Sequence, residues 1–437
     1  MHIYFDETIE KGNRANLREL QAKKLLDIFH KVYENSQFYN TKWKSAGIKD
    51  ARLIKSIEDY FKLPLTTKDE LVKDQAKNPP FGTNLCVPLR DCIRMHQTSG
   101  TTGRPLRILD TSESWEWWLR CWSIVYKGAG VGADDRIYMA FSFGPFIGFW
   151  SAYEAAEKIG ALVIPGGGLQ TRARIEAIVE NGATVLVCTP TYALRLAEVA
   201  ADHDINLVDS SVKRVMCAGE PGANIPATKK RIEDSWGAKC FDHTGMTEVG
   251  AIGFECESQP GGIHLIESEF LIEVIDPKTG EPLSEAEKGE LVITNLGRYS
   301  MPVFRYRTGD LVKLNYAQCE CGRIFVRADG GILGRADDMF VVRGINIFPS
   351  AVENIIRQYN EVEEFRIEIY KEREMKEIDI KLELNPYVKS PDIASLIAQS
   401  IVDELQTKLL LTAKTTIVRY GSLPRFDMKA KRCIICD

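Results

Sequence analysis

The segment from Thr98 to Pro105 has the composition of a loop that binds phosphate. It reads Thr-Ser-Gly-Thr-Thr-Gly-Arg-Pro and carries hydroxyl side chains, glycines and one arginine. Glycine lets backbone N–H groups approach a ligand closely, and hydroxyl groups add donors that can rotate. Such a loop suits phosphate oxygens, but it is not a Walker loop, because the G-x-x-x-x-G-K-[ST] spacing is absent. Taken alone, the segment is equally compatible with a polar surface turn.

Further motifs follow this loop along the chain. In order, they are Asp242-His243-Thr244-Gly245-Met246-Thr247-Glu248, Tyr306-Arg307-Thr308-Gly309-Asp310-Leu311, Gly334-Arg335-Ala336-Asp337-Asp338-Met339, Arg343-Gly344-Ile345-Asn346-Ile347-Phe348-Pro349 and Pro424-Arg425-Phe426-Asp427-Met428-Lys429-Ala430-Lys431-Arg432. Together with the glycine loop, they resemble the core motifs of the adenylate-forming enzymes, which include acyl-CoA ligases, luciferases and the adenylation domains of peptide synthetases. The third and fourth motifs resemble most the phenylacetate-CoA ligase family. The resemblance covers nearly the whole chain.

The resemblance implies how ATP is bound. The β- and γ-phosphates would be held by Ser99, Gly100, Thr101, Thr102 and Gly103. Asp310 would accept both ribose hydroxyls, since a carboxylate has two acceptor oxygens. The adenine site would be formed by Gly219, Glu220, Pro221, Phe241, Asp242 and Thr244, with Arg335 nearby. The family usually has an aromatic residue that stacks on adenine at the position of Thr244, so this contact stays open, and Phe241 is a candidate to replace it.

The same resemblance assigns the catalytic and CoA-binding residues. Lys429 would bridge the substrate carboxylate and the AMP phosphate as charge shifts in the first transition state. Glu248 would ligate Mg²⁺ through oxygen. Arg343 and Gly344 would let the pantetheine arm of coenzyme A pass close to the backbone, and Asp337 would be the hinge of a mobile C-terminal domain. A basic solvated tail is the alternative reading of the segment around Lys429.

The segment from Phe141 to Gly148 matches the position of the family's acid-binding pocket. Its three phenylalanines, separated by small residues, suit a flat aromatic acid, although a buried hydrophobic loop would look the same. The residues assigned to this pocket are Phe141, Phe143, Phe146, Gly148, Ala218, Gly219, His243 and Gly245.

Cys256, His264, Cys319 and Cys321 form a candidate structural zinc site. Four nitrogen and sulfur ligands would complete a tetrahedral Zn²⁺ site. The C-x-C spacing is unusual for zinc, and reduced thiols beside a polar histidine are the alternative, but some proteins of the resembling family carry zinc at such positions. Cys433 and Cys436 form a C-x-x-C in an apolar tail, where we expect the thiols to behave as small hydrophobic groups.

The composition restricts the classes of function. The chain has 437 residues, of which 44% are hydrophobic, and a formal net charge of -5, which does not indicate a nucleic-acid-binding protein. No apolar run approaches the ~20 residues of a membrane span. The eleven cysteines, without an apolar leader, indicate a reducing compartment. We therefore expect a cytoplasmic protein without a membrane partner.

Hydrophobic periodicity predicts the elements that position these residues. A helix is expected over residues 16–38 and strands over 86–95 and 107–109. Helices and strands alternate from 136 to 218, and β-rich hairpins follow over 270–314. Gly128–Ala133 matches G-x-G-x-x-A, but a helix precedes it and a strand follows, so it is not a dinucleotide-binding loop.

The fold expected is therefore α/β, in two domains. Residues 1–336 would form a large adenylation domain with helix-covered sheets and a β-rich portion. Residues 337–437 would form a small mobile α+β C-terminal domain. Its predicted elements are a helix over 352–358, strands over 365–370 and 378–384, and a helix over 391–410.

Three hypotheses for function follow. The first is an ATP-dependent ligase that activates an aryl or arylacetic acid as acyl-AMP and transfers the acyl group to coenzyme A. The second is the same adenylation chemistry with an acyl carrier protein as acceptor. The third is a non-catalytic, zinc-stabilised binding protein. The expected cofactors are ATP, Mg²⁺, coenzyme A and structural Zn²⁺, and a homodimer is left open.

Overall fold

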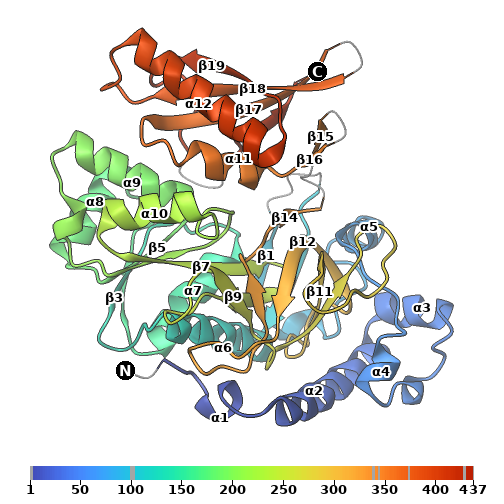
Figure 1. Cartoon of the computed structure of the whole chain (residues 1–437). Helices are drawn as coiled ribbons and strands as arrows, with labels where there is room; N and C mark the ends of the chain where they lie inside the picture. Colours follow the sequence, from blue (N-terminus) through green and yellow to red (C-terminus); the bar gives the residue numbers. More distant parts are fainter. Residues whose placement is uncertain are drawn as a thin grey trace.

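The structure, a computed structural model, describes residues 3–98, 104–336, 340–342, 345–372, 375–426 and 430–436. Its larger part is built on a 12-stranded sheet and its smaller C-terminal part on a 4-stranded sheet (Figure 1). The strand order of the large sheet is β10-β11-β12-β13-β9-β8-β7-β6-β5-β3-β4, and β14 pairs with β12. The α/β fold that the sequence predicts is confirmed.

One half of the large sheet is parallel and is covered by helices on both faces. Its strands are β3 (Arg136–Met139), β4 (Leu162–Pro165), β5 (Val185–Cys188), β6 (Arg214–Cys217) and the start of β7 (Lys239–Met246). Its helices are α7 (Ile147–Lys158), α8 (Thr171–Glu180), α9 (Pro190–Asp202) and α10 (Pro226–Trp236). In β5, Val185 and Val187 join the core that includes α7, whereas Leu186 and Cys188 join the core of α8, α9 and α10. The helix α10 was not foreseen.

The other half of the sheet is antiparallel. Its strands are β8 (Gly250–Phe254), β9 (Gly262–Leu265), β10 (Phe270–Ile275), β11 (Lys288–Asn295), β12 (Tyr306–Asn315), β13 (Arg327–Asp329) and β14 (Gly334–Arg335). The helix α6 (Ser112–Gly128) packs against β8. It ends at Gly128, where a Cβ atom would lie 2.1 Å from the ring of Phe254. A dinucleotide-binding loop would connect a strand to a following helix, whereas Gly128–Ala133 begins at the end of the helix α6 and precedes the strand β3.

The N-terminal helices pack through aromatic side chains. They are α1 (Glu7–Glu10), α2 (Arg14–Asn35), α3 (Gln37–Ser45), α4 (Ile57–Tyr60) and α5 (Lys68–Lys77). The single helix expected over 16–38 is interrupted at Ser36, whose hydroxyl accepts the N–H of Tyr39 and caps α3. The rings of Tyr39 and Trp43 lie 5.4 and 5.1 Å from that of Phe304.

A hairpin of β1 (Cys92–Gln97) and β2 (Arg107–Thr111) flanks the glycine loop. The strand expected from Cys86 begins later, because a 3₁₀ turn, η2 (Leu89–Asp91), precedes it. The other 3₁₀ turns are η1 (Ala51–Leu53) and η3 (Leu207–Asp209). Among the described residues, no helix combines the length and apolarity of a membrane span.

The C-terminal part is an α+β unit with its own hydrophobic core. Its elements are β15 (Phe340–Val342), β16 (Ile345–Ile347), α11 (Pro349–Ile356), β17 (Val362–Glu372), β18 (Met375–Leu384), α12 (Pro391–Leu409), β19 (Lys414–Val418) and β20 (Cys433–Ile435). The sheet order is β19-β18-β17-β20. Its core begins at Phe340 and is separate from the cores of the larger part. The domain boundary at Asp337 stays a prediction, because residues 337–339 lie outside the described residues.

An ion pair in the interior ties β2 to the segment after β11. Arg298 and Asp110 are both fully buried, with Nε–Oδ1 and Nη2–Oδ2 distances of 2.9 and 2.6 Å. The third guanidinium nitrogen, Nη1, donates to the carbonyl of Thr247 at 2.7 Å. The guanidinium lies over the ring of Trp118. This bidentate geometry fixes three chain segments relative to one another.

Removing one partner of this pair is expected to destabilise the folded protein. Asp110→Ala should lower the free energy of unfolding by about 3–5 kcal/mol, because Arg298 would stay buried without a counter-charge. Asp69→Ala, which removes an exposed carboxylate on α5, is the control and should change it by less than about 0.5 kcal/mol. Urea denaturation followed by tryptophan fluorescence measures both. Equal values for the two variants would contradict the prediction.

Candidate active site

The predicted adenine-site residues lie after the carboxyl end of β6 and along β7. These strands pair in parallel with Cys217 opposite Asp242, so Gly219 and Asp242 are brought to one edge of the sheet. Gly219 has φ +96°, a backbone conformation that favours glycine. At Gly222, a Cβ atom would lie only 2.4 Å from Pro190, so only glycine lets the loop pass this close to the start of α9. Ligands of α/β proteins bind at such strand ends.

Asp242 sits in a buried charged group. Its N–H donates to Glu255 Oε2 at 2.9 Å, and Lys229 Nζ lies 2.6 Å from both oxygens of Glu255. Burial, and then the negative charge of Glu255, raise the pKa of Asp242 to about 7. The carboxyl group of Asp242, in the site predicted for adenine, can therefore gain or lose its proton near neutral pH.

Asp310 and Arg335 are brought together by pairing of β12 with β14. They are opposite one another in the register, and Arg335 Nη1 lies 3.3 Å from Asp310 Oδ1. The backbone N–H of Asp310 donates to the hydroxyl of Thr308. Arg307, in the same motif, pairs with Glu290. Glu290 also accepts the N–H of Gly309, so this pair supports the turn before Asp310 indirectly.

Glu248 is 4% exposed and is held by two side chains. The hydroxyl of Tyr306 donates to its Oε1 at 2.8 Å, and Lys68 Nζ lies 3.5 Å from the same oxygen. Burial and the charge of Glu248 raise the pKa of Tyr306 well above its ordinary value, so the hydroxyl stays a donor. The contact of Lys68 with Glu248 was not foreseen from the sequence. The position of Lys68 at the start of α5, after the capping box of Thr67, was the available signal, but it indicates only a helix start.

The expected acid-binding segment is aromatic and partly packed on itself. The ring centroids of Phe141 and Phe149 are 3.5 Å apart, and Phe143 packs against Trp150 and Tyr153. Of the remaining residues assigned to this pocket, Phe146 and Gly148 are half-buried and continue this segment into α7, whereas Ala218 follows β6.

Arg174, which was also not foreseen from the sequence, holds the start of the expected acid-binding segment in place through hydrogen bonds. It is 5% exposed, and its guanidinium donates to the carbonyls of Gly166 and Ala140 and to the hydroxyl of Ser142.

Three assigned residues on β7 differ in what they can offer a ligand. His243 is buried, with its ring centroid 4.2 Å from that of Trp122 and its Nδ1 donating to the carbonyl of Gly253. Burial lowers its pKa to about 4, so the ring is neutral. Thr244 is half-buried and Gly245 is exposed. Phe241 is 3% exposed and packs in the main core, so its burial does not favour stacking on adenine.

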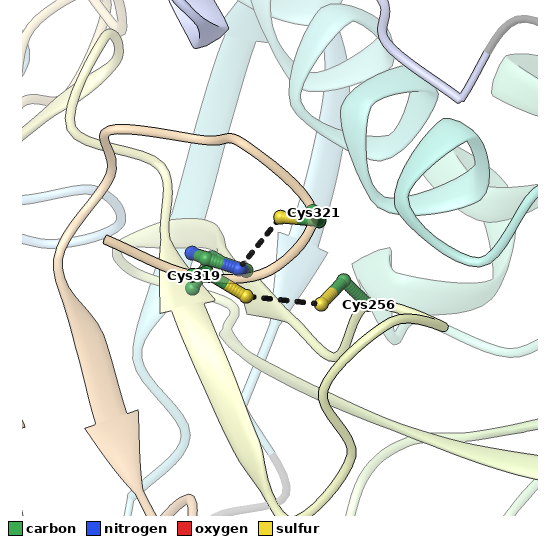
Figure 2. Close-up of side chains that lie close together, drawn as sticks. Cys256, Cys319 and Cys321 are labelled. Carbon is green, nitrogen blue, oxygen red and sulfur yellow. Dashed lines mark hydrogen bonds between the residues drawn. The ribbon is translucent and has the colours of Figure 1, made fainter. Parts of the chain in front are cut away.

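The four candidate metal ligands are brought together in the interior (Figure 2). Their ligand atoms all lie within 4.8 Å of one another. Cys256 Sγ is 3.6 Å from Cys319 Sγ, and Cys321 Sγ is 3.4 Å from His264 Nε2. His264 Nδ1 donates to the carbonyl of Phe325, which leaves Nε2 facing the thiols. The residues thus fit a tetrahedral site.

Other assigned residues lie outside the part of the chain that the structure describes and stay predictions. They are Ser99, Gly100, Thr101, Thr102, Gly103, Asp337, Arg343, Gly344 and Lys429.

The raised pKa of Asp242 predicts a pH dependence of stability. Between 3.8 and about 7, the folded protein keeps a proton that the unfolded chain releases. The free energy of unfolding should therefore fall as pH rises through this range, relative to Asp242→Asn, by at most about 4 kcal/mol. Urea denaturation of both proteins at several pH values measures the difference. A difference that does not change with pH would contradict the prediction.

Comparison with known proteins gives consistent matches over the chain. The AMP-binding enzyme family matches residues 38–300, and the AMP-binding enzyme C-terminal domain matches 344–435. The phenylacetate-coenzyme A ligase of Thermus thermophilus is 31% identical, over 97% of this chain and 97% of the relative. That of Escherichia coli is 30% identical, over 98% and 96%.

The chain resembles two crystal structures of one enzyme to different degrees. A crystal structure of 2-hydroxyisobutyryl-CoA ligase in the postadenylation state has a TM-score of 0.94 at 29% identity, covering 99% of this chain and 92% of that one. The same enzyme in its thioesterification state, with the same coverage, has a TM-score of 0.75 at 30% identity. The two parts of this chain are therefore arranged more like those of the first crystal structure than like those of the second. The chain belongs to the phenylacetate-CoA ligase family of AMP-binding enzymes and is an acid–thiol ligase.

Proposed function

We propose that this ligase activates an aromatic carboxylic acid as acyl-AMP and transfers the acyl group to coenzyme A. What supports this proposal is that Asp242, Glu248 and Asp310 are each held by neighbouring polar groups, in a chain of this family that also carries the aromatic segment around Phe141. The curated relatives named phenylacetate-CoA ligase support an arylacetic acid. An acyl carrier protein as acceptor is the alternative, since it presents the same phosphopantetheine thiol. The non-catalytic hypothesis finds no support in a ligase family.

Each residue has a defined task in the proposed reaction. Asp310, oriented by Arg335, would accept the ribose hydroxyls of ATP. Glu248 would ligate Mg²⁺, and the ion would neutralise phosphate charge. Tyr306 and Lys68 hold the carboxylate of Glu248 in place. Joining two anions requires such preorganised charge, because the site must offset their repulsion.

The C-terminal residues would serve the two steps in turn. Lys429 would act on the carboxylate and phosphate in the first step, and Arg343 and Gly344 would face the arriving thiol in the second. A rotation of the small domain about Asp337 would move Lys429 out of the site and bring Arg343 and Gly344 into it.

Separate half-reactions test this function. Acid-dependent pyrophosphate exchange should be supported by benzoates, anthranilate or phenylacetates more than by 2-hydroxyisobutyrate or short fatty acids. Lys429→Ala should abolish this exchange but spare thioester formation from supplied acyl-AMP, because the lysine acts on charge present only in the first step. Parallel assays with coenzyme A and a holo-carrier protein identify the acceptor. Preferential exchange with aliphatic acids would overturn the aromatic assignment, and equal loss of both half-reactions would overturn the role of Lys429.

We also propose that the Cys256, His264, Cys319 and Cys321 cluster holds a structural Zn²⁺. The chemistry of the set supports this, because three thiols and one imidazole nitrogen match a closed zinc site. The N-terminal segment packs on it: the hydroxyl of Tyr4 donates to the carbonyl of Cys321 at 2.5 Å. Bound metal would then also hold residues 3–10 in place.

The zinc proposal predicts about one zinc per chain in protein purified without chelators. Cys319→Ser should lose most of this metal and lower the melting temperature, because metal binding is linked to folding. Cys433→Ser, outside the cluster, should keep the metal. Elemental analysis and thermal unfolding measure these outcomes, and metal-free wild-type protein would contradict the proposal.

A further inference from the structure

Glu220 links the start of α9 to the last segment of the C-terminal part. Its Oε1 accepts the N–H of Thr191 at 2.9 Å, and its Oε2 accepts the N–H of Ala430 at 2.5 Å. Thr191 is in the first turn of α9, where the helix dipole favours a negative charge. Both carboxylate oxygens are thus engaged by backbone groups of two different parts of the protein.

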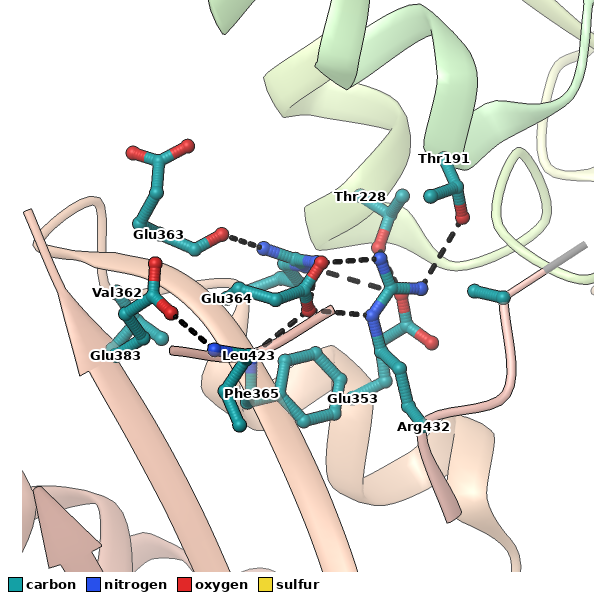
Figure 3. A network of polar contacts seen from close by, with 12 residues as sticks. Thr191, Thr228, Glu353, Val362, Glu363, Glu364, Phe365, Glu383, Leu423 and Arg432 are labelled. Carbon is teal, nitrogen blue, oxygen red and sulfur yellow. Dashed lines mark hydrogen bonds and ion pairs between the residues drawn. The ribbon is translucent and has the colours of Figure 1, made fainter. Parts of the chain in front are cut away.

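Thr191 makes a second contact across the same boundary. Its hydroxyl accepts from Arg432 Nη1 at 3.2 Å, while Arg432 Nε and Nη2 lie 2.7 and 3.0 Å from the carboxylate of Glu364 (Figure 3). Glu364 also pairs with Arg357. Although burial opposes ionisation, these two arginines lower the pKa of Glu364 to about 2. The orientation of Arg432 is therefore fixed from within the C-terminal part.

A third contact lies further along α9. Arg425 Nε is 3.4 Å from Glu198 Oε1, and Arg425 also pairs with Glu383 of β18. Arg425 and Arg432, which precede and follow Lys429 in the sequence, thus both contact α9 of the large part. These contacts belong to an arrangement like that of the postadenylation crystal structure, and the boundary they cross must change if the C-terminal part rotates.

We propose that Thr191 and Glu220 are positioning residues for the first half-reaction. They hold the segment that contains Lys429 against α9 while acyl-AMP forms, and they release it before the thiol attacks. This inference rests on the proposed two-step function, and it gives Glu220 a role different from that of an adenine contact. Neither residue touches the reacting atoms in this role.

Two variants separate the contacts. Thr191→Val keeps the shape and the N–H to Glu220 but removes the acceptor for Arg432. Glu220→Gln keeps the shape but removes the charge and one acceptor oxygen. Thr191→Ser, which keeps the hydroxyl, is the conservative rescue. Glu180→Gln removes an exposed carboxylate from the neighbouring helix α8 and is the control.

The two half-reactions are expected to respond differently. Thr191→Val and Glu220→Gln should each slow pyrophosphate exchange by about tenfold, the effect of losing one charge-assisted hydrogen bond. Thioester formation from supplied acyl-AMP should be unchanged or faster. Small-angle X-ray scattering with AMP present should move away from the profile calculated for this structure. Thr191→Ser and Glu180→Gln should resemble the wild type in all three measurements.

Other outcomes would overturn the inference. Equal loss of both half-reactions with unchanged scattering would mean a purely structural role. Weaker AMP binding by Glu220→Gln with unchanged scattering would make Glu220 a nucleotide contact. Unchanged rates and scattering would remove the positioning role. If the wild type shows no exchange with any acid, the proposed function fails, and scattering of the variants still decides whether these contacts hold the two parts together.

Discussion

The buried pair of Arg298 and Asp110 is the constraint on which the active-site edge of the large sheet depends. Asp110 lies on β2, the second strand of the hairpin that flanks the glycine loop, and Arg298 follows β11. Through Nη1, Arg298 also holds the carbonyl of Thr247, the residue before Glu248. One guanidinium therefore links β2 to the residue that precedes the predicted magnesium ligand. This link is rigid, because breaking the buried pair would leave a charge in the interior without a partner.

Strand pairing in the large sheet positions the other predicted site residues. The parallel half ends its strands β6 and β7 beside each other, which places Gly219 next to Asp242, and β7 then continues into the antiparallel half. Asp310 lies on β12 and is oriented by Arg335 of β14, which pairs with it. Residues separated by up to about a hundred positions in the sequence are thus collected by strand pairing, and not by contacts between neighbours in the chain.

Much of this arrangement was predictable, and the exceptions have physical reasons. Alternating helices and strands predicted the parallel half, because β-strands buried on both faces and amphipathic helices leave clear periodicities. The set Cys256, His264, Cys319 and Cys321 was identified from residue type together with the resemblance to the family. Lys68 and Arg174 were missed, since a helix start and a helix interior give no sign that the charge points to a distant loop. Glu220 was assigned to adenine from its motif, whereas its partners, Thr191 and Ala430, are visible only in the fold.

The aromatic packing of the N-terminal helices has a consequence for synthesis on the ribosome. Tyr39 and Trp43 are fully buried against Phe304, whose N–H also donates to the Tyr39 hydroxyl. Phe304 is translated about 260 residues later, which takes roughly 10–50 seconds at ordinary elongation rates. During that interval, the apolar faces of α2 and α3 lack their final partner. A nascent chain of this length is therefore a natural client for chaperones that shield exposed aromatic surface, and conditions that slow elongation between these positions should favour aggregation of the unfinished protein.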